Sequence, residues 1–139
     1  MIAVDAGTLA RLAEAARSVP RTEHDRLTRR LVAAGGAGDV RALSAILAPD
    51  VIVVSDGGEA VPAAAAVACG ADDAGWLVAA LLGAPGIRLT FAEVNGRLGV
   101  VVHRGRDAVA VVAPEVGFGG IAALWVVRNP AKLRAWQSP

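Results

Sequence analysis

The stretch Asp39-Val-Arg-Ala-Leu-Ser-Ala-Ile-Leu-Ala-Pro-Asp-Val-Ile-Val-Val-Ser-Asp-Gly-Gly58 decides the fold. Its first half predicts a helix, because Asp39 can accept hydrogen bonds from the free amides of a first turn and apolar residues then recur at helical spacing until Pro49. Its second half predicts a strand, since Val51–Val54 is a run of β-branched residues with no polar interruption. A helix that leads directly into a buried strand is expected to lie on the sheet that contains the strand.

The residues that follow predict a turn, a return strand and another helix. Asp56-Gly57 is a favoured pair for a two-residue hairpin turn, and residues 60–68 form a candidate return strand in which Pro62 favours an edge position. Residues 72–83 predict a helix, and we expect its inward face to consist of four apolar residues: Trp76, Leu77, Ala80 and Leu81. Gly75 within that helix indicates close packing against a neighbour.

From Ile87 the apolar period changes to two, which predicts an antiparallel meander. Asn95-Gly96 is a strong hairpin signal, and the four strands are expected at residues 87–92, 98–104, 107–116 and 121–128. Upstream, residues 8–19 with Thr8 as a cap and residues 22–36 with a Thr22–Asp25 capping box predict two helices. Together these patterns predict an α+β domain.

We expect three helices to pack in the concavity of a curved, mostly antiparallel sheet. In this interpretation residues 1–20 form a helical appendage and residues 21–139 form the domain. The predicted strands carry more apolar surface than three short helices can cover, and five residues contribute to it: Val109, Val111, Ile121, Ala123 and Val127. That surplus predicts a homodimer through the outer face of the sheet.

Composition excludes several classes of function. The chain of 139 residues is 55% apolar and carries 14 basic and 13 acidic residues, so its net charge of +1 gives no field that would recruit nucleic acid or an acidic membrane. One cysteine, Cys69, without a Cys/His grouping excludes an internal disulfide and argues against a zinc site, and we expect no metal or cofactor. The N-terminus has no basic segment and no long apolar run, which favours a cytoplasmic protein without a membrane anchor.

Few residues are candidates for catalysis. His103 lies on a predicted strand and Asp56 ends a buried one, so the two are the weak candidates for a general acid and base. The alternative, non-catalytic interpretations are that His103 is either hydrogen-bonded within the fold or exposed to solvent, and that Asp56 hydrogen-bonds the backbone of its own turn. His24 is interpreted as a solvated residue in a first helical turn. No GxGxxG, P-loop, GxSxG or HExxH motif occurs, so the sequence favours a protein that is not an enzyme.

Aromatic residues offer a candidate ligand pocket. Trp76, Phe91 and Trp125, with His103 as a polar group, could line an apolar cavity inside the fold. The alternative use of these rings is to fill the core. An apolar small molecule is the ligand that such a pocket would take.

Several short motifs resemble the SnoaL-like domain at the C-terminus of a group of extracytoplasmic-function RNA polymerase sigma factors. That family carries an LAPDV segment leading to a DGGGK turn, a VNG hairpin and a closing RNPDKL. In this sequence the matching segments are Leu47–Val51, Asp56-Gly57-Gly58, Val94–Gly96, Arg128-Asn129-Pro130 and Lys132-Leu133. The sequence departs from the pattern at Glu59-Ala60 and at Ala131.

The resemblance implies a cone-shaped fold shared with nuclear transport factor and ketosteroid isomerase. It implies a free-standing regulatory or ligand-binding domain, with a sigma factor or RNA polymerase component as its protein partner. A small isomerase, cyclase or hydrolase is the alternative, although the chain contains no tyrosine of the kind that the steroid isomerases use. We expect the closing segment, with Arg128, Asn129, Pro130 and Lys132, to form one contact surface with the turn at Asp56, Gly57 and Gly58.

Overall fold

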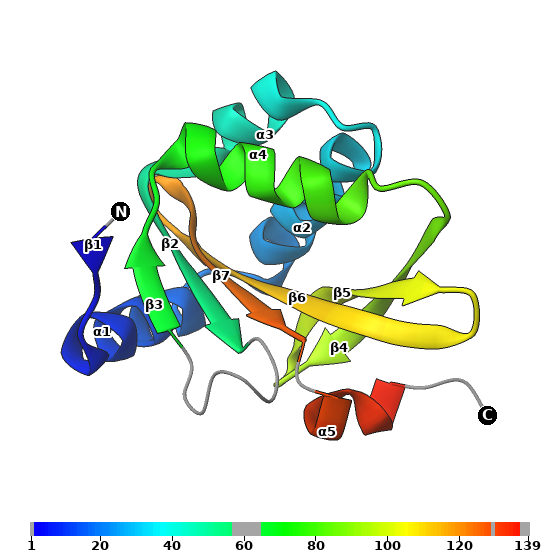
Figure 1. The fold of residues 1–139 in the computed structure, drawn as a ribbon. Coiled ribbons are helices and arrows are strands. Elements are labelled where there is room, and N and C mark those ends of the chain that lie inside the picture. Colours follow the sequence, from blue (N-terminus) through cyan, green and yellow to red (C-terminus); the bar gives the residue numbers. More distant parts are fainter. Residues whose placement is uncertain (1, 57–64, 129, 137–139) are drawn as a thin grey trace.

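A computed structural model of the chain describes residues 2–56, 65–128 and 130–136. It contains a curved seven-stranded sheet with helices on both faces (Figure 1). In chain order the elements are β1 Ile2–Ala3, α1 Ala6–Arg17, α2 Arg21–Gly36, α3 Val40–Ile46, β2 Leu47–Asp56, β3 Ala65–Ala68, α4 Ala71–Leu82, β4 Ile87–Val94, β5 Arg97–Arg104, β6 Asp107–Gly117, β7 Gly120–Val127, α5 Pro130–Leu133 and a 3-10 turn Arg134–Trp136.

The strands lie in the order β1-β3-β2-β7-β6-β5-β4, and the pair β2 and β7 is parallel while the other neighbours are antiparallel. The predicted α+β class and the mostly antiparallel sheet are therefore confirmed. No helix among residues 2–56, 65–128 and 130–136 is both long enough and apolar enough to cross a membrane.

One face of the sheet packs against α2, α3 and α4. Strand residues that point to this face, such as Val53 and Leu124, join buried helical residues such as Leu31 and Leu43 in the main core. Leu31, Leu43 and Leu124 have no exposed surface. The predicted arrangement of three helices in the concavity of the sheet is confirmed for these helices.

The opposite face of the sheet carries two smaller layers. Helix α1 packs through Leu9 and Leu12 over Ile52, Val54 and Ala123. Leu133 of α5 joins a second cluster that also contains Val101, Ala108 and Val111. Strand β2 contributes to clusters on both faces of the sheet, because successive side chains of a strand point to opposite faces. Val53 belongs to the main core, and Ile52 and Val54 lie under α1.

This second layer changes the expectation about apolar surface. The dimer prediction assumed that the strands would be left uncovered, but Val111, Ile121 and Ala123 are at most 2% exposed within one chain. Helix α5 covers Val111 and helix α1 covers Ala123, while Ile121 belongs to the main core on the other face. The apolar surplus behind the dimer prediction is therefore largely buried in the monomer.

The segment that decides the fold follows its prediction with one change. Asp39 Oδ1 accepts a hydrogen bond of 3.1 Å from the Ala42 amide, as a helix cap does. However, α3 ends at Ile46, before Pro49, because Leu47 already belongs to β2 and pairs with Ile121. Strand β2 thus begins four residues earlier than the β-branched run, with a register irregularity between Leu47 and Ile52.

Three local predictions were wrong. Asp5, not Thr8, caps α1, and its Oδ1 accepts a hydrogen bond of 2.7 Å from the Thr8 amide. Helix α2 begins at Arg21 after Pro20, whose fixed φ suits a helix start, so no capping box forms at Thr22. The pair Ser55 and Ala65 in the ladder of β2 and β3 rules out a two-residue hairpin at Asp56-Gly57.

The described part of the predicted return strand is not at the edge of the sheet. Strand β3 covers Ala65–Ala68 and lies between β2 and the two residues of β1. The N-terminal segment, which the sequence suggested to be a mere appendage, therefore adds the edge strand of the sheet. Pro62, on which the edge prediction rested, lies outside the described residues.

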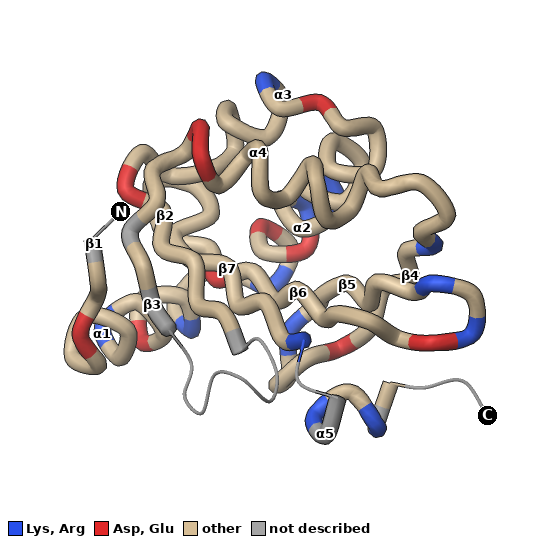
Figure 2. Tube along the Cα trace, viewed as in Figure 1, with Lys and Arg blue, Asp and Glu red and all other residues tan. Residues whose placement is uncertain are grey.

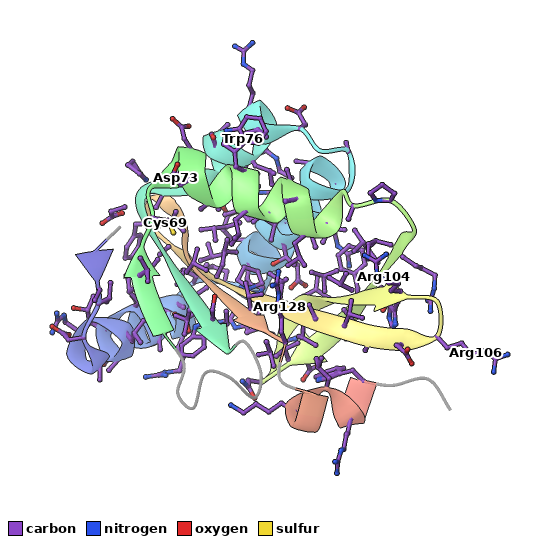
Figure 3. The ribbon with its side chains drawn as sticks, in the orientation of Figure 1. Cys69, Asp73, Trp76, Arg104, Arg106 and Arg128 are labelled. Atoms are coloured by element: carbon purple, nitrogen blue, oxygen red, sulfur yellow. The ribbon has the colours of Figure 1, made fainter. Side chains whose placement is uncertain are left out.

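The inward face of α4 was also predicted wrongly. Trp76 is 67% exposed and Leu77 is 40% exposed, whereas Ala74, Gly75 and Val78 are buried. A Cβ atom at Gly75 would lie 3.3 Å from Ser44 Oγ, so this glycine allows α3 and α4 to approach closely, as predicted. That contact sets the rotation of α4 and turns Trp76 away from the sheet (Figure 3).

Candidate functional site

A cavity of about 410 Å³ opens on the face of the sheet that carries α1. It lies between the C-terminal half of α1, the strands β6 and β7, and the hairpin that joins β4 to β5. Its apolar lining consists mainly of Ala13, Ala16, Val111, Ala113, Trp125 and Val127. Four of its polar or charged lining residues are Arg17, His24, Arg97 and Glu115.

Strand pairing places the floor of the cavity. Ala113 of β6 pairs with Trp125 of β7, and Glu115 pairs with Ala123, so Glu115 and Trp125 are diagonal neighbours on one face. The two strands are joined by the short turn at Gly117–Gly120, as the sequence predicted. Small side chains on α1 and β6 leave room above the indole ring.

Glu115 is the carboxylate of the cavity. Trp125 Nε1 donates a hydrogen bond of 2.9 Å to Glu115 Oε1. Burial raises the pKa of Glu115, and the hydrogen bond from Trp125 and the charge of Arg17 oppose that rise. A carboxyl group in such a setting can accept a hydrogen bond when ionised or donate one when protonated.

Arg97 attaches α1 to the rest of the domain. Its Nη2 atom donates to the carbonyl groups of Ala16 and Arg17, each at 3.3 Å, and of Val19 at 3.0 Å. These carbonyls lie at and just beyond the C-terminus of α1, where the last backbone acceptors of a helix lack helical partners. The guanidinium group also complements the negative end of the helix dipole.

The hairpin that carries Arg97 is held at a second point. Arg21 Nη2 donates a hydrogen bond of 2.9 Å to the carbonyl of Gly96. Asn95 and Gly96 have φ of 50° and 83°, the left-handed conformations that a two-residue hairpin turn requires, so this prediction is confirmed. The hairpin tip is thus attached to the junction of α1 and α2.

His24 was interpreted as a solvated residue, and this interpretation is wrong. Its side chain is 3% exposed and its Nε2 lies 2.9 Å from the carbonyl of Leu98. Because a carbonyl oxygen can only accept, we assign the hydrogen to Nε2. The histidine borders the cavity while its ring is anchored to β5.

His103 and Asp56, the candidate acid and base, are not brought together. They lie on β5 and β2, which are separated in the sheet by β6 and β7. His103 is 5% exposed and lies 2.8 Å from Thr90 Oγ1, and burial, together with the charge of Arg88, lowers its pKa. Asp56 ends β2 opposite Val127. His103 does not line the cavity described above.

The four residues proposed for an aromatic pocket are also dispersed. Trp76 lies on the exposed side of α4, and Phe91 is 44% exposed with the guanidinium of Arg29 5.0 Å from its ring centre. His103 is in the sheet, and of the four only Trp125 lines the cavity. The structure thus does not bring the four residues together, and the cavity that Trp125 lines lies on the face of the sheet that carries α1.

Three of the seven residues of the proposed contact surface lie outside the described residues. This applies to Gly57, Gly58 and Asn129. The register does place its two halves near each other, since Asp56 pairs with Val127 and Arg128 follows directly. Arg128 and Lys132 are exposed, and Pro130 begins α5.

Charged residues are mixed in sign over the part of the chain that the structure describes (Figure 2). Figure 2 shows acidic and basic residues scattered over the molecule. Among the described residues no group of three His, Cys, Asp or Glu side chains is arranged to hold a metal ion.

Comparison with known proteins relates the chain to a sigma factor. The chain is 31% identical over 124 residues to the ECF RNA polymerase sigma factor SigJ of Mycobacterium tuberculosis, an alignment that covers 81% of this chain and 40% of SigJ. The crystal structure of SigJ superimposes with a TM-score of 0.58 and 30% identity over 91% of this chain and 49% of that chain. The matching part of SigJ is its SnoaL-like C-terminal domain. This chain therefore spans less than half of its relative. No protein-family model matches it.

Two further structures show the same fold. An NTF2-like protein of unknown function from Mesorhizobium loti has a TM-score of 0.55 and 19% identity, covering 76% of this chain and 90% of that one. An LEH-like epoxide hydrolase from M. tuberculosis has a TM-score of 0.51 and 17% identity, covering 81% and 86%. The predicted resemblance to SnoaL-like and NTF2-like cone domains is confirmed.

Proposed function

This chain has the NTF2-like, cystatin-like fold and resembles the C-terminal domain of SigJ, and from this premise we propose that it binds an apolar small molecule without converting it. The observation that carries the proposal is the cavity between α1 and the sheet. Its volume of about 410 Å³ and its mainly apolar lining suit a ligand of modest size.

Most polar groups around the cavity already serve the fold, which favours binding over catalysis. Arg97 Nη2 donates to three backbone carbonyls, and His24 Nε2 is directed at the carbonyl of Leu98. Glu115 accepts from Trp125. An acid and base pair of the kind that proton transfer needs would require groups that are free to meet a substrate.

A neutral fluorescent probe, N-phenyl-1-naphthylamine, tests the proposal. Ala113→Phe places a ring in the cavity, and we expect it to weaken binding of the probe at least tenfold while the circular dichroism spectrum stays unchanged. Ala10→Phe is the matched control, because Ala10 is exposed on α1 and does not line the cavity. Equal binding by the wild type and Ala113→Phe, or no binding by the wild type, contradicts the proposal.

We further propose that a sigma factor or another RNA polymerase component binds the chain differently when the ligand is present and when it is absent. The support for this step is the relation to SigJ, which is itself a sigma factor. Immobilised chain, with and without the probe, is to be incubated with purified core polymerase and sigma factors. Retention of one of them that changes between wild type and Ala113→Phe supports regulation, and the absence of retention argues against it.

A homodimer through the outer face of the sheet would have to use the surface that α1 and α5 leave uncovered. On the outer face this surface includes the rim of the cavity. We propose that a dimer through this face forms across the cavity mouth, and that it would exclude the probe. Sedimentation velocity at micromolar concentration, with and without the probe, measures this competition, and a monomer under both conditions rules the dimer out.

Catalysis at the same cavity is the second candidate. It is favoured by the position of Glu115, a carboxyl group in the lining of a mainly apolar cavity, where burial raises its pKa. In that case Glu115→Gln would bind substrate normally but lose turnover, since the amide cannot transfer the proton. Unchanged turnover in Glu115→Gln would remove Glu115 from any such mechanism.

A further inference from the structure

The hydrogen-bonding capacity left on Glu115 defines what the cavity can recognise. Oε1 accepts from Trp125 Nε1 at 2.9 Å, and within the described parts of the chain no cationic nitrogen lies within 4.0 Å of the carboxylate. An ionised carboxylate offers about four acceptor positions. Glu115 thus retains acceptor capacity beside the apolar floor formed by Ala113 and Trp125.

The charges around the cavity argue against a charged ligand. Arg17 lies near enough to Glu115 to lower the pKa of this carboxyl group, so the guanidinium partly compensates the negative charge of Glu115. A cationic ligand would therefore compete with Arg17 for the carboxylate. Arg97 could attract a ligand anion, but its Nη2 atom holds α1 through three carbonyl groups. Its Nη1 atom makes no hydrogen bond with the described residues, but it is buried and therefore does not face the open part of the cavity. A ligand anion would also be repelled by an ionised Glu115.

We infer that the ligand is a neutral, mainly apolar molecule that carries one hydroxyl or amide N–H donor, and that this donor hydrogen-bonds to Glu115. This inference rests on the proposed binding function and specifies the chemical class of the ligand. The apolar body lies against Val111, Ala113 and Trp125, and the donor reaches the acceptor oxygen that Trp125 leaves available. Glu115 is then the residue that determines specificity.

The hydrogen bond from Trp125 makes one substitution especially informative. In Glu115→Gln the indole N–H can be satisfied by the amide oxygen, which leaves the amide NH₂ group directed at the ligand. The group that faces the ligand at position 115 changes from a hydrogen-bond acceptor to a donor, with almost no change of side-chain volume. The variant is therefore expected to lose its preference for hydroxyl compounds and to prefer a carbonyl compound of similar shape.

Four naphthalene derivatives test the inference by isothermal titration calorimetry of the full chain at pH 8. 2-Naphthol supplies the donor, 2-methylnaphthalene is its apolar isostere, 2-naphthoate is the anion and 2-acetylnaphthalene supplies an acceptor. We expect wild type to bind 2-naphthol about tenfold tighter than 2-methylnaphthalene, because a hydrogen bond to a charged acceptor is stronger than one between neutral groups. Glu115→Gln should bind 2-acetylnaphthalene tighter than 2-naphthol.

Glu93→Gln is the matched control, since Glu93 is exposed on β4 and does not line the cavity. It should keep the wild-type order of affinities. Equal binding of 2-naphthol and 2-methylnaphthalene, tighter binding of 2-naphthoate, or an unchanged order in Glu115→Gln overturns the inference and leaves the binding function standing. Failure of all four compounds to bind wild type contradicts the binding function itself.

Discussion

Arg97 Nη2 donates a hydrogen bond of 3.0 Å to the carbonyl of Val19, which is 78 positions earlier in the chain. The same atom reaches Ala16 and Arg17. Helix α1 has no fully buried residue of its own, so these contacts form a large part of what holds its C-terminus against the domain.

Arg97→Ala should therefore loosen α1 and destabilise the domain by about 1–3 kcal/mol, since three backbone carbonyls, two of them partly buried, lose a charged donor. The free energy of unfolding in urea measures the loss, and hydrogen exchange of the α1 amides locates it. Arg106→Ala is the control, because Arg106 points away from the molecule (Figure 3), and it should change stability by less than about 0.5 kcal/mol. Unchanged protection of α1 in Arg97→Ala would show that the apolar contacts of the helix suffice.

Gly120→Ala should destabilise the domain by about 2 kcal/mol or more. Gly120 has φ of 110°, and an added Cβ would lie 2.7 Å from the carbonyl oxygen of Ile46. Gly119→Ala is the control in the same turn, since its Cβ would meet no atom within 4 Å. Thermal unfolding compares the two variants, and equal melting temperatures would mean that the turn can shift away from α3 without cost.

His103 should make stability fall in mild acid. Its folded pKa lies below the ordinary value of 6.5, chiefly through burial, so the unfolded state binds the proton more readily. Stability from this group is complete above pH 6.5 and is lost as the pH falls from there toward the folded pKa. His103→Gln keeps a hydrogen-bonding partner for Thr90 and should lack this loss, which urea unfolding at pH 7.5 and 5.5 would detect. Parallel pH profiles of the two proteins would contradict the assignment.

Glu115 should act in the opposite direction. Burial raises its folded pKa above the ordinary value of 4.5, so the folded state binds the proton more tightly than the unfolded state does. Its contribution to stability is complete below pH 4.5 and is lost as the pH rises from there through the folded pKa. The stability of Glu115→Gln relative to wild type should therefore increase with pH over this range. A constant difference would indicate that the carboxylate is fully solvated.

Some local features were predicted correctly from the sequence, although the caps at Thr8 and Thr22 and the hairpin at Asp56-Gly57 were not. Asp39 caps its helix and Asn95-Gly96 makes its hairpin because each depends only on adjacent backbone groups. The face of α4 could not be predicted in this way, since Trp76 and Val78 fit the helical period about equally well and the approach of Gly75 to Ser44 decides between them.

Apart from Trp125, the residues of the candidate site were missed for a related reason. Glu115 and Trp125 are ten positions apart on either side of a turn that the sequence did predict, so pairing of those strands could have placed them on one face. The cover over them could not have been found, because it depends on Arg97 reaching the end of α1 from a distant hairpin. His24 was misjudged on similar grounds, as its partner Leu98 is 74 positions away.

The parallel pairing of β2 with β7 also bears on how the chain reaches this structure. Val53 lies opposite Leu124, and 71 positions separate them, so the central ladder of the sheet cannot form until nearly the whole chain is present. During synthesis the helices and β2 would emerge first, with the apolar edge of β2 unpaired until the last strand arrives. Such long-range closure slows folding relative to domains built from local contacts. The segment from Val51 to Val54 is accordingly the part of the nascent chain that most needs protection from aggregation.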